Sequence, residues 1–297
     1  MKSGIVVLKK EEGITSQGAV NRIKRLFYAE KAGHTGTLDP LATGVLPVLV
    51  GRAVKASEYM LTSDKYYRAT LLLGITTDTE DVTGTTITES SVIPDESAVL
   101  DAISEFTGEI MQVPPMYSAL KVGGKKLCDL AREGIEIKRE PRAVTVHSVI
   151  ATKIDPRRYS LDVHCSKGTY IRTLCADIGK RLGCGGVMET LERTKASVFT
   201  LDDAHTLSEI EAMSDAEREA LVIPVERVFE GLDAIRLQPF FSRLARCGLE
   251  IYLAKIGVSL DVGERVRLCD EEGFFALGEV KEFEDGLAIK PIKQFSL

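Results

Sequence analysis

The stretch Gly33–Pro47, with the sequence GHTGTLDPLATGVLP, constrains the fold more than any other part of the chain. It contains three glycines, three threonines and two prolines, with one histidine and one carboxylate. Glycine permits backbone conformations that other residues avoid, and Pro40 disfavours a helical conformation at Asp39. The stretch is therefore predicted to be neither a regular helix nor a regular strand. An isolated Asp-Pro step is most often only a turn, but here we expect a loop that is held against the core and presents Asp39.

Length and composition indicate an ordinary soluble globular protein. The 297 residues suffice for one large domain and a small one, and the hydrophobic fraction of 44% is usual for a soluble protein. No apolar run reaches the roughly 18 residues that a membrane-spanning helix needs. The N-terminal run Met1–Lys10 lacks a signal-peptide cleavage pattern and is predicted to be a first strand, so we expect a cytoplasmic protein.

The six cysteines do not indicate disulfides or a metal centre. They include no C-x-x-C pair, and a chain of this length needs no covalent staples. Cys165, Cys175 and Cys184, with His164 beside the first of them, do not have the spacing of zinc ligands. No metal site is therefore predicted.

The charge of the chain is unevenly distributed. The formal net charge of −6 argues against nucleic acid as a partner. Residues 1–60, however, carry nine Lys or Arg against five Asp or Glu, a balance of +4, and residues 114–172 carry twelve against six, a balance of +6. Residues 78–110 carry nine Asp or Glu and no Lys or Arg. The two basic segments either form one electropositive face for an anionic polymer or are an ordinary fluctuation on a solvated surface.

Hydrophobic periodicity and turn residues predict an α+β protein. Strands are expected at 5–8, 48–50, 66–74, 87–88, 142–154 and 159–165, and helices at 15–28, 53–61, 95–106, 127–132 and after 168. Residues 188–199 are assigned no element and lead to an acidic helical stretch at about 208–221.

The pattern changes near residue 235. Short strands at 262–269, 274–280 and 287–291 are joined by Gly, Asp and Glu turns, after a helix at 240–244. This predicts a main domain at 1–234 and a small β-rich domain at 235–297, with 224–235 as the linker. Residues 121–143 contain a Gly-Gly-Lys-Lys turn and are predicted to project from the main domain as a basic arm, with an ordinary surface hairpin as the alternative.

Residue chemistry by itself leaves the activity open. The chain has no serine-hydrolase, zinc-protease, P-loop or dinucleotide-binding motif. Asp78, Glu80 and Asp81 offer a candidate divalent-ion site for a metal-dependent hydrolase, but their place in a threonine-rich loop favours solvated side chains. The residues indicate a cytosolic α+β enzyme that uses a carboxylate, with an anionic polymer as candidate substrate.

The segment Gly33–Gly44 resembles the signature of the TruB family, the bacterial tRNA pseudouridine synthases that act on the TΨC-loop uridine. The segments Asp64–Tyr67 (DKYY), Pro114–Lys121 (PPMYSALK) and Cys165–Arg172 (CSKGTYIR) resemble three further family segments, in the family's order. The C-terminal module is similar, more weakly, to a PUA-type RNA-binding domain. The resemblance implies the pseudouridine synthase fold, which has a mixed, mainly antiparallel sheet. It also implies a monomer that isomerises uridine at tRNA position 55, with the TΨC stem-loop as partner and no metal or cofactor.

The resemblance also implies the catalytic residues. Asp39 matches the catalytic aspartate, and Arg172 matches the arginine that pairs with that carboxylate. Tyr67 matches the tyrosine that packs on the target base. A nearby arginine keeps a carboxylate ionised, and an aromatic face holds a detached base while it turns.

Further positions are implied to bind the substrate. Tyr170 and Leu191 match residues that line the uridine pocket, and His34 matches the histidine that helps to displace the uridine from the folded loop. Lys10 fills the position of a family lysine. The proline that usually follows this lysine is absent from Lys9–Gly13 (KKEEG), so a less rigid turn is expected there.

A non-catalytic tRNA-binding or tRNA-folding module that uses the same surface is the main alternative. It predicts tRNA refolding that survives the substitution Asp39→Ala. The metal-dependent hydrolase is a third reading, which full activity in excess chelator would exclude.

Overall fold

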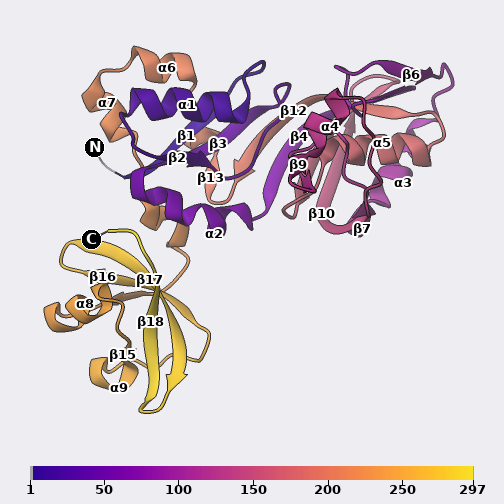
Figure 1. The fold of residues 1–297 in the computed structure, drawn as a ribbon. Coiled ribbons are helices and arrows are strands. Elements are labelled where there is room, and N and C mark those ends of the chain that lie inside the picture. The colour runs from indigo at the N-terminus through magenta and orange to yellow at the C-terminus, as the bar shows by residue number, and fades with distance from the viewer. Residues whose placement is uncertain (1–2, 297) are drawn as a thin grey trace.

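The computed structural model describes residues 3–296 and, within that range, every side chain except that of Lys126. Figure 1 shows an elongated upper body and a smaller C-terminal body beneath one end of it. A nine-stranded sheet forms the upper body and a five-stranded sheet the lower one. The predicted α+β class, with a mainly antiparallel sheet and a β-rich C-terminal module, is confirmed.

The large sheet has the strand order β1-β3-β12-β4-β11-β10-β7, with β2 paired to β3 and β13 paired to β12. Its strands are β1 (Gly4–Lys10), β2 (Ala32–His34), β3 (Thr43–Val50), β4 (Lys65–Leu73), β7 (Gly108–Gln112), β10 (Arg142–Lys153), β11 (Arg158–Cys165), β12 (Gly186–Ala196) and β13 (Phe199–Thr200). Neighbouring strands are antiparallel except β3 and β12, which are parallel over a short junction. This junction joins the two halves of the sheet, and the irregular loop at 35–42 lies beside it.

Three helices cover one face of the large sheet. They are α1 (Ser16–Leu26), α3 (Glu96–Ser104) and α5 (Ile171–Arg181), and their apolar residues share one core with β3, β4 and β11. Helix α1 begins as predicted, because the Thr15 side chain accepts a hydrogen bond from the backbone N–H of Gly18. Its buried Ala19 and Ile23 lie one turn apart on a single face.

The smaller elements complete the two bodies. In the upper body they are η1 (Gly51–Ala56), α2 (Ser57–Leu61), β5 (Ile75–Thr77), β6 (Thr86–Glu89), β8 (Lys121–Val122), β9 (Lys125–Lys126), α4 (Leu127–Arg132), η2 (Leu201–Asp203), α6 (Leu207–Ala212), α7 (Asp215–Ala220) and η3 (Val225–Phe229). In the C-terminal body they are β14 (Ala234–Arg236), α8 (Pro239–Arg246), β15 (Ile251–Tyr252), α9 (Leu253–Ile256), β16 (Arg265–Asp270), β17 (Gly273–Phe283) and β18 (Gly286–Gln294). None of the helices in the described part of the chain is long and apolar enough to cross a membrane.

Three local predictions are corrected. Both ends of the stretch Gly33–Pro47 lie in strands β2 and β3, and only 35–42 is irregular. Strand β12 (186–196) lies near the middle of the sheet and covers most of 188–199, the region in which the sequence pattern predicts no element. The helical stretch at 208–221 is two helices, because Ser214 and Glu217 form a capping box that starts α7.

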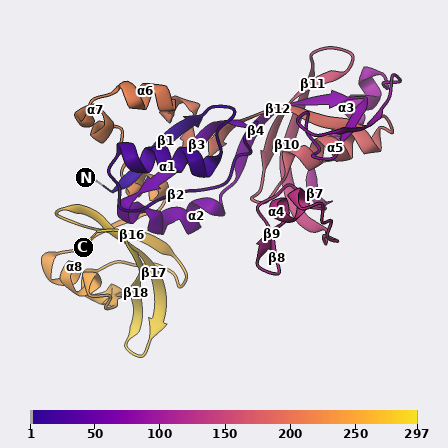
Figure 2. The ribbon, with the colours of Figure 1, turned by 45° about the horizontal axis from the view of Figure 1, so that its top comes forward.

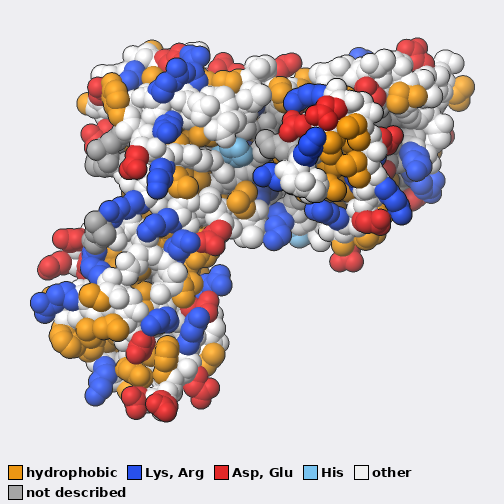
Figure 3. All heavy atoms as spheres, in the orientation of Figure 1, with side chains coloured by type: hydrophobic (Ala, Val, Ile, Leu, Met, Phe, Trp, Pro, Cys, Tyr) orange, Lys and Arg blue, Asp and Glu red, His pale blue; other side chains and the backbone are white. Residues whose placement is uncertain are grey.

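Residues 121–143 form the short β8–β9 hairpin, helix α4 and an irregular return, and Figure 2 shows the hairpin extending from the edge of its lobe. Figure 3 shows one face of the molecule, on which Lys and Arg side chains alternate with Asp and Glu on both bodies. Of the two alternatives for the basic segments, this face therefore fits ordinary charge fluctuation on a solvated surface and not a single electropositive surface.

Candidate active site

The loop that carries Asp39 is fixed from below by helix α1. Ser16, which is buried, donates a hydrogen bond from its hydroxyl to the Leu38 carbonyl at 2.9 Å and accepts one from the Leu38 backbone N–H at 2.8 Å. The Ala42 N–H donates to the carbonyl of Asp39, which closes a turn around Pro40. The backbone on both sides of the carboxylate is therefore held in place.

Lys10 lies fully buried beneath the same loop. Its ammonium donates to the carbonyls of Glu11, Pro40 and Ala42 at 2.9, 3.2 and 2.5 Å. Burial lowers the pKa of Lys10 to about 8, although Asp39 opposes the shift. The lysine predicted to bind substrate thus cross-links the loop, and this position suits a residue that orients Asp39.

Arg193, which sequence reasoning missed, joins the loop to strand β12. It is 1% exposed, and its Nε donates to the Val45 carbonyl at 2.8 Å while its Nη2 donates to the Gly36 carbonyl at 3.1 Å. Its positive charge also opposes the rise that burial causes in the pKa of the Tyr67 hydroxyl. One buried cation therefore ties both ends of the loop to strand β12.

Arg172 pairs with Asp39 as predicted. Its Nε lies 3.0 Å from Asp39 Oδ2, and the arginine is 5% exposed against 37% for the carboxylate. Its other nitrogens donate to the carbonyls of Thr79 and Tyr117 at 3.0 and 2.7 Å. The guanidinium is thus held by two loops and presents one edge to the carboxylate, which remains partly accessible.

Neighbouring charges of both signs act on the pKa of Asp39. Burial raises the pKa of the Asp39 carboxyl above its ordinary value, and the guanidinium of Arg172 opposes that rise. The buried Asp81, whose Oδ2 lies 3.6 Å from Arg172 Nη1, adds to it. Asp39 is therefore an ionisable group in a desolvated site with a specific charge partner, which is typical of functional carboxylates.

The carboxylate stands at the wall of a pocket of about 270 Å³. The pocket brings together five of the predicted site residues: Asp39, Tyr67, Tyr170, Arg172 and Leu191. Burial raises the pKa values of both the Tyr67 and Tyr170 hydroxyls, so both rings stay neutral near pH 7. The backbone of Tyr170, just before α5, is held by Gln112, whose amide accepts from its N–H at 3.0 Å and donates to its carbonyl at 3.2 Å.

His34 lies outside this pocket, in a neighbouring groove of about 880 Å³. Asp39 and Arg172 line both hollows, and the groove also contains Tyr117 and Arg132. The Nδ1 of His34 accepts a hydrogen bond from the Gly36 N–H at 3.3 Å, and burial lowers its pKa. The ion pair between Asp39 and Arg172 therefore lies between the small pocket, which has aromatic walls, and the larger groove.

The acidic loop has a different role from the solvated one expected. Asp78 is exposed, but Asp81 is buried against Arg172, and Glu80 accepts a hydrogen bond from the Thr173 hydroxyl at 2.6 Å. Within residues 3–296, neither this loop nor the three cysteines at 165, 175 and 184 places three ligand atoms together. The acidic loop instead supports the arginine that pairs with Asp39.

Comparisons with known proteins agree with this architecture. A chain in the crystal structure of a Cbf5–Nop10–Gar1 complex superposes with a TM-score of 0.73 at 26% identity, covering 98% of this chain and 84% of that one. The protein named tRNA pseudouridine synthase B from Methylobacillus flagellatus is 43% identical, over 93% of this chain and 90% of its own. The protein of the same name from Alkaliphilus oremlandii is 40% identical, over 94% of this chain and 93% of its own.

Family models assign the class of enzyme. The N-terminal domain model of the TruB family pseudouridylate synthases matches residues 24–171, and the tRNA pseudouridylate synthase B C-terminal domain model matches residues 172–230. The chain is therefore a pseudouridine synthase, an enzyme that isomerises uridine in RNA. Within that class, the chain belongs to the TruB family.

Proposed function

We propose that this enzyme isomerises the TΨC-loop uridine at position 55 of tRNA and that Asp39 is its catalytic carboxylate. The observation that carries the proposal is the 3.0 Å ion pair between Asp39 and Arg172 at the wall of a pocket lined by Tyr67 and Tyr170. Relatives that share about two fifths of their residues with this chain are named as tRNA-modifying enzymes, which supports tRNA as the substrate.

The reaction needs no change of oxidation state. The N1–C1′ bond of uridine breaks, the uracil rotates, and a C5–C1′ bond forms. C5 then loses its proton and N1 gains one. Asp39 either attacks the sugar or accepts a sugar proton, and both routes need its ionised form. Arg172 favours that form and keeps the carboxylate aimed at the sugar.

The pocket holds the base while it turns. Tyr67 and Tyr170 offer aromatic surfaces and Leu191 an apolar wall, which suits a flat base that must rotate without leaving. The uridine has to leave its stack to reach this pocket. In the proposal, His34 and the arm at 121–143 enter the folded loop from the adjoining groove and occupy the space that the uridine leaves.

The β-rich segment 235–297 is proposed to be a separate PUA-like domain that binds another part of the tRNA. A surface hollow of about 740 Å³ supports this, because Arg236, Arg243 and Arg246 line it. Asp270 and two further acidic residues share the hollow, so contacts to phosphate would be local.

Mapping of pseudouridine in an unmodified tRNA transcript tests the proposal. Wild type should convert one uridine of the TΨC loop, and Asp39→Ala should lose at least about 10⁴-fold in rate, because the acting carboxylate is gone. The affinity of the variant for the same transcript should stay within about tenfold of wild type. Retained conversion by Asp39→Ala would refute the assignment of Asp39. A chain that refolds tRNA but never forms pseudouridine would instead be the non-catalytic module.

A further inference from the structure

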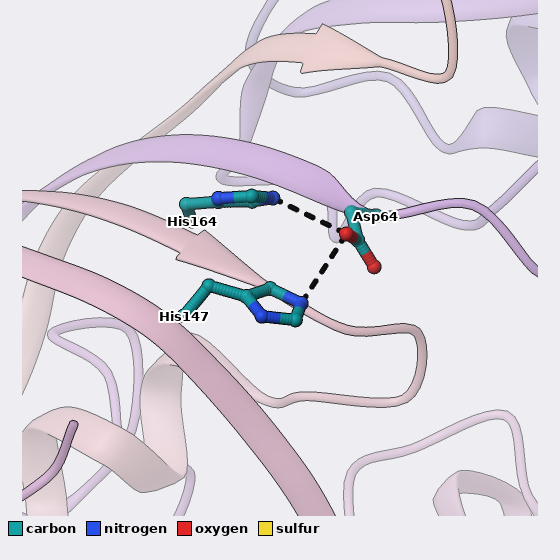
Figure 4. Close-up of side chains that lie close together, drawn as sticks. All are labelled: Asp64, His147 and His164. Carbon is teal, nitrogen blue, oxygen red and sulfur yellow. Dashed lines mark hydrogen bonds and ion pairs between the residues drawn. The ribbon is translucent and has the colours of Figure 1, made fainter. Parts of the chain in front are cut away.

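The face of the large sheet opposite the active-site pocket carries a cluster of two histidines and a carboxylate. Along β4, Lys65 and Tyr67 line the pocket, so Tyr66 between them faces the other side. There the Tyr66 ring stacks on the His164 imidazole of β11, with 4.0 Å between ring centroids and an angle of 8°. Asp64, just before β4, and His147 of β10 complete the cluster, which Figure 4 shows converging from three neighbouring segments.

A β-bulge places His147 in the cluster. Between β10 and β11, Val146 pairs with Cys165 and Ser148 with His164, so His147 is an extra residue in the ladder. Bulges redirect side chains and are recurrent functional features rather than defects. The irregularity brings the His147 ring within 4.5 Å of the His164 ring, measured between centroids.

The three polar atoms are spaced like ligands of one metal ion. Asp64 Oδ2 lies 3.2 Å from His147 Nε2 and 3.3 Å from His164 Nε2. A tetrahedral zinc ion with bonds of about 2.0–2.1 Å separates neighbouring ligand atoms by about 3.3 Å. All three ligand atoms lie within 4.8 Å of one another, so little movement is needed for them to share an ion.

We propose that Asp64, His147 and His164 bind a divalent transition-metal ion of the zinc class, with water in the remaining position. Two imidazoles and one carboxylate suit zinc or nickel rather than magnesium, which prefers oxygen ligands. The side chains of His147 and His164 are 37% and 25% exposed, so an ion can enter from solvent. The alternative is a cluster without a metal, in which Asp64 accepts hydrogen bonds from both imidazoles.

The ion would be structural. It would tie the start of β4 to β10 and β11 on the face away from Asp39, three residues before Tyr67. Since its ligands do not line the pocket, removing the ion should lower the melting temperature and leave the isomerisation step nearly unchanged.

Calorimetric titration of zinc into chelator-treated full-length protein tests this assignment. Wild type should bind one ion at the cluster, and Asp64→Asn and His164→Gln should each weaken that binding by at least about tenfold. The matched control is His205→Gln, which removes a histidine from outside the cluster and should bind like wild type. Magnesium should give no comparable binding.

Three further measurements exclude misleading results. Cobalt bound to the protein should give a spectrum without a thiolate charge-transfer band, which excludes cysteine as a ligand of the ion. The double variant Cys128→Ser, Cys247→Ser, which removes the two cysteines that are not buried, should bind zinc like wild type. Zinc at about a hundred times its Kd should raise the melting temperature of wild type by roughly 5 °C and that of His164→Gln hardly at all. Unchanged affinity in both cluster variants, or binding lost in the cysteine variant, would overturn the proposal.

Discussion

At the scale of single residues, the ionisation of Asp39 is set by its neighbours. Desolvation raises the pKa of its carboxyl, the Arg172 cation lowers it, and the Asp81 anion raises it again. Asp81 also shares Arg172 with Asp39, at 3.6 Å from Nη1, so the two carboxylates compete for one guanidinium. The proposed reaction needs ionised Asp39, and this balance therefore sets the acidic limit of activity.

Substituting Asp81 should move that limit in a defined direction. Asp81→Asn removes a negative charge that raises the pKa of Asp39, so that pKa should fall. The acidic limb of the profile of kcat/KM against pH should then move to lower pH. Asparagine retains an oxygen that can accept the hydrogen bonds from Thr79 and Thr83 that now reach Asp81 Oδ1, so the loop should keep its shape.

The matched control for this prediction is Asp78→Asn, in the same loop. Asp78 is exposed, and it is not among the charges that shift the pKa of Asp39. Its profile should coincide with that of wild type. An acidic limb that moves to higher pH in Asp81→Asn, or that moves equally in both variants, would contradict the proposed role of Asp81.

Some of these residues could be anticipated from the sequence and others could not. Asp39 and Arg172 lie in segments with a distinctive family pattern. Arg193 lies in Leu191–Lys195 (LERTK), whose charges are typical of a solvated surface, and only its place in a central strand makes it buried. Lys10 was expected to contact substrate, but an ammonium that faces three backbone carbonyls is recognisable only once the loop is folded above it.

At the scale of elements, the parallel junction between β3 and β12 supports the active-site loop. Gly44 pairs with Arg193 there and has a φ of +97°. A Cβ atom at Gly44 would lie 2.3 Å from the Arg193 carbonyl oxygen, which is backbone and cannot move aside. The glycine is therefore required both for its conformation and for the close approach of the two strands.

Gly44→Ala should damage stability and activity together. We expect a loss of about 3 kcal/mol in the free energy of unfolding, from backbone strain and forced separation of the strands. We also expect kcat to fall at least about tenfold, because Arg193 positions the loop that carries Asp39. Urea denaturation and single-turnover rates measure the two effects.

Gly108→Ala separates strain from steric overlap. Gly108 has a similar φ of +107°, but a Cβ there meets nothing within 4 Å. Gly108→Ala should lower the free energy of unfolding by only about 1 kcal/mol, from backbone strain, and should leave kcat unchanged. Equal losses in the two variants would show that contact with Arg193 is unimportant.

The predictability of an element depended on how regular its pattern was. The helix expected at 95–106 is observed as α3, because Asp95 caps it and its apolar residues repeat at helical spacing. The sequence does not identify strand β12, because the strand has register shifts between Met188 and Thr190 and between Arg193 and Lys195. Each shift interrupts the alternation of buried and exposed residues that identifies a strand.

At the scale of the whole molecule, the two bodies share a hydrophobic cluster. It joins Ile5 and Met60 of the upper body to Leu277 and Phe295 of the C-terminal body. Phe229 of η3 lies at its centre, where its ring is 5.3 Å from that of Tyr59 and 5.4 Å from that of Phe295, measured between centroids. The sequence indicated a linker here, but it contained no signal for which surfaces the linker would bring together.

This junction should fix how a long RNA lies on both bodies at once. Phe229→Ala removes the ring at the centre of the cluster and should lower the free energy of unfolding by roughly 3–4 kcal/mol. If the C-terminal domain binds tRNA as proposed, a loosened junction should raise KM for full-length tRNA. It should hardly change KM for an isolated TΨC stem-loop, which is short enough to be held by the upper body alone.

Phe240→Ala is the matched control, because Phe240 lies on α8 of the C-terminal body and is 59% exposed. Phe240→Ala should lower the free energy of unfolding by less than about 1 kcal/mol. It should leave both KM values unchanged unless the RNA contacts the Phe240 ring. Denaturation curves and steady-state kinetics on the two RNA lengths separate these effects. If Phe229→Ala destabilises the chain yet raises KM equally for both RNAs, the junction contributes stability but does not orient the C-terminal domain on the substrate.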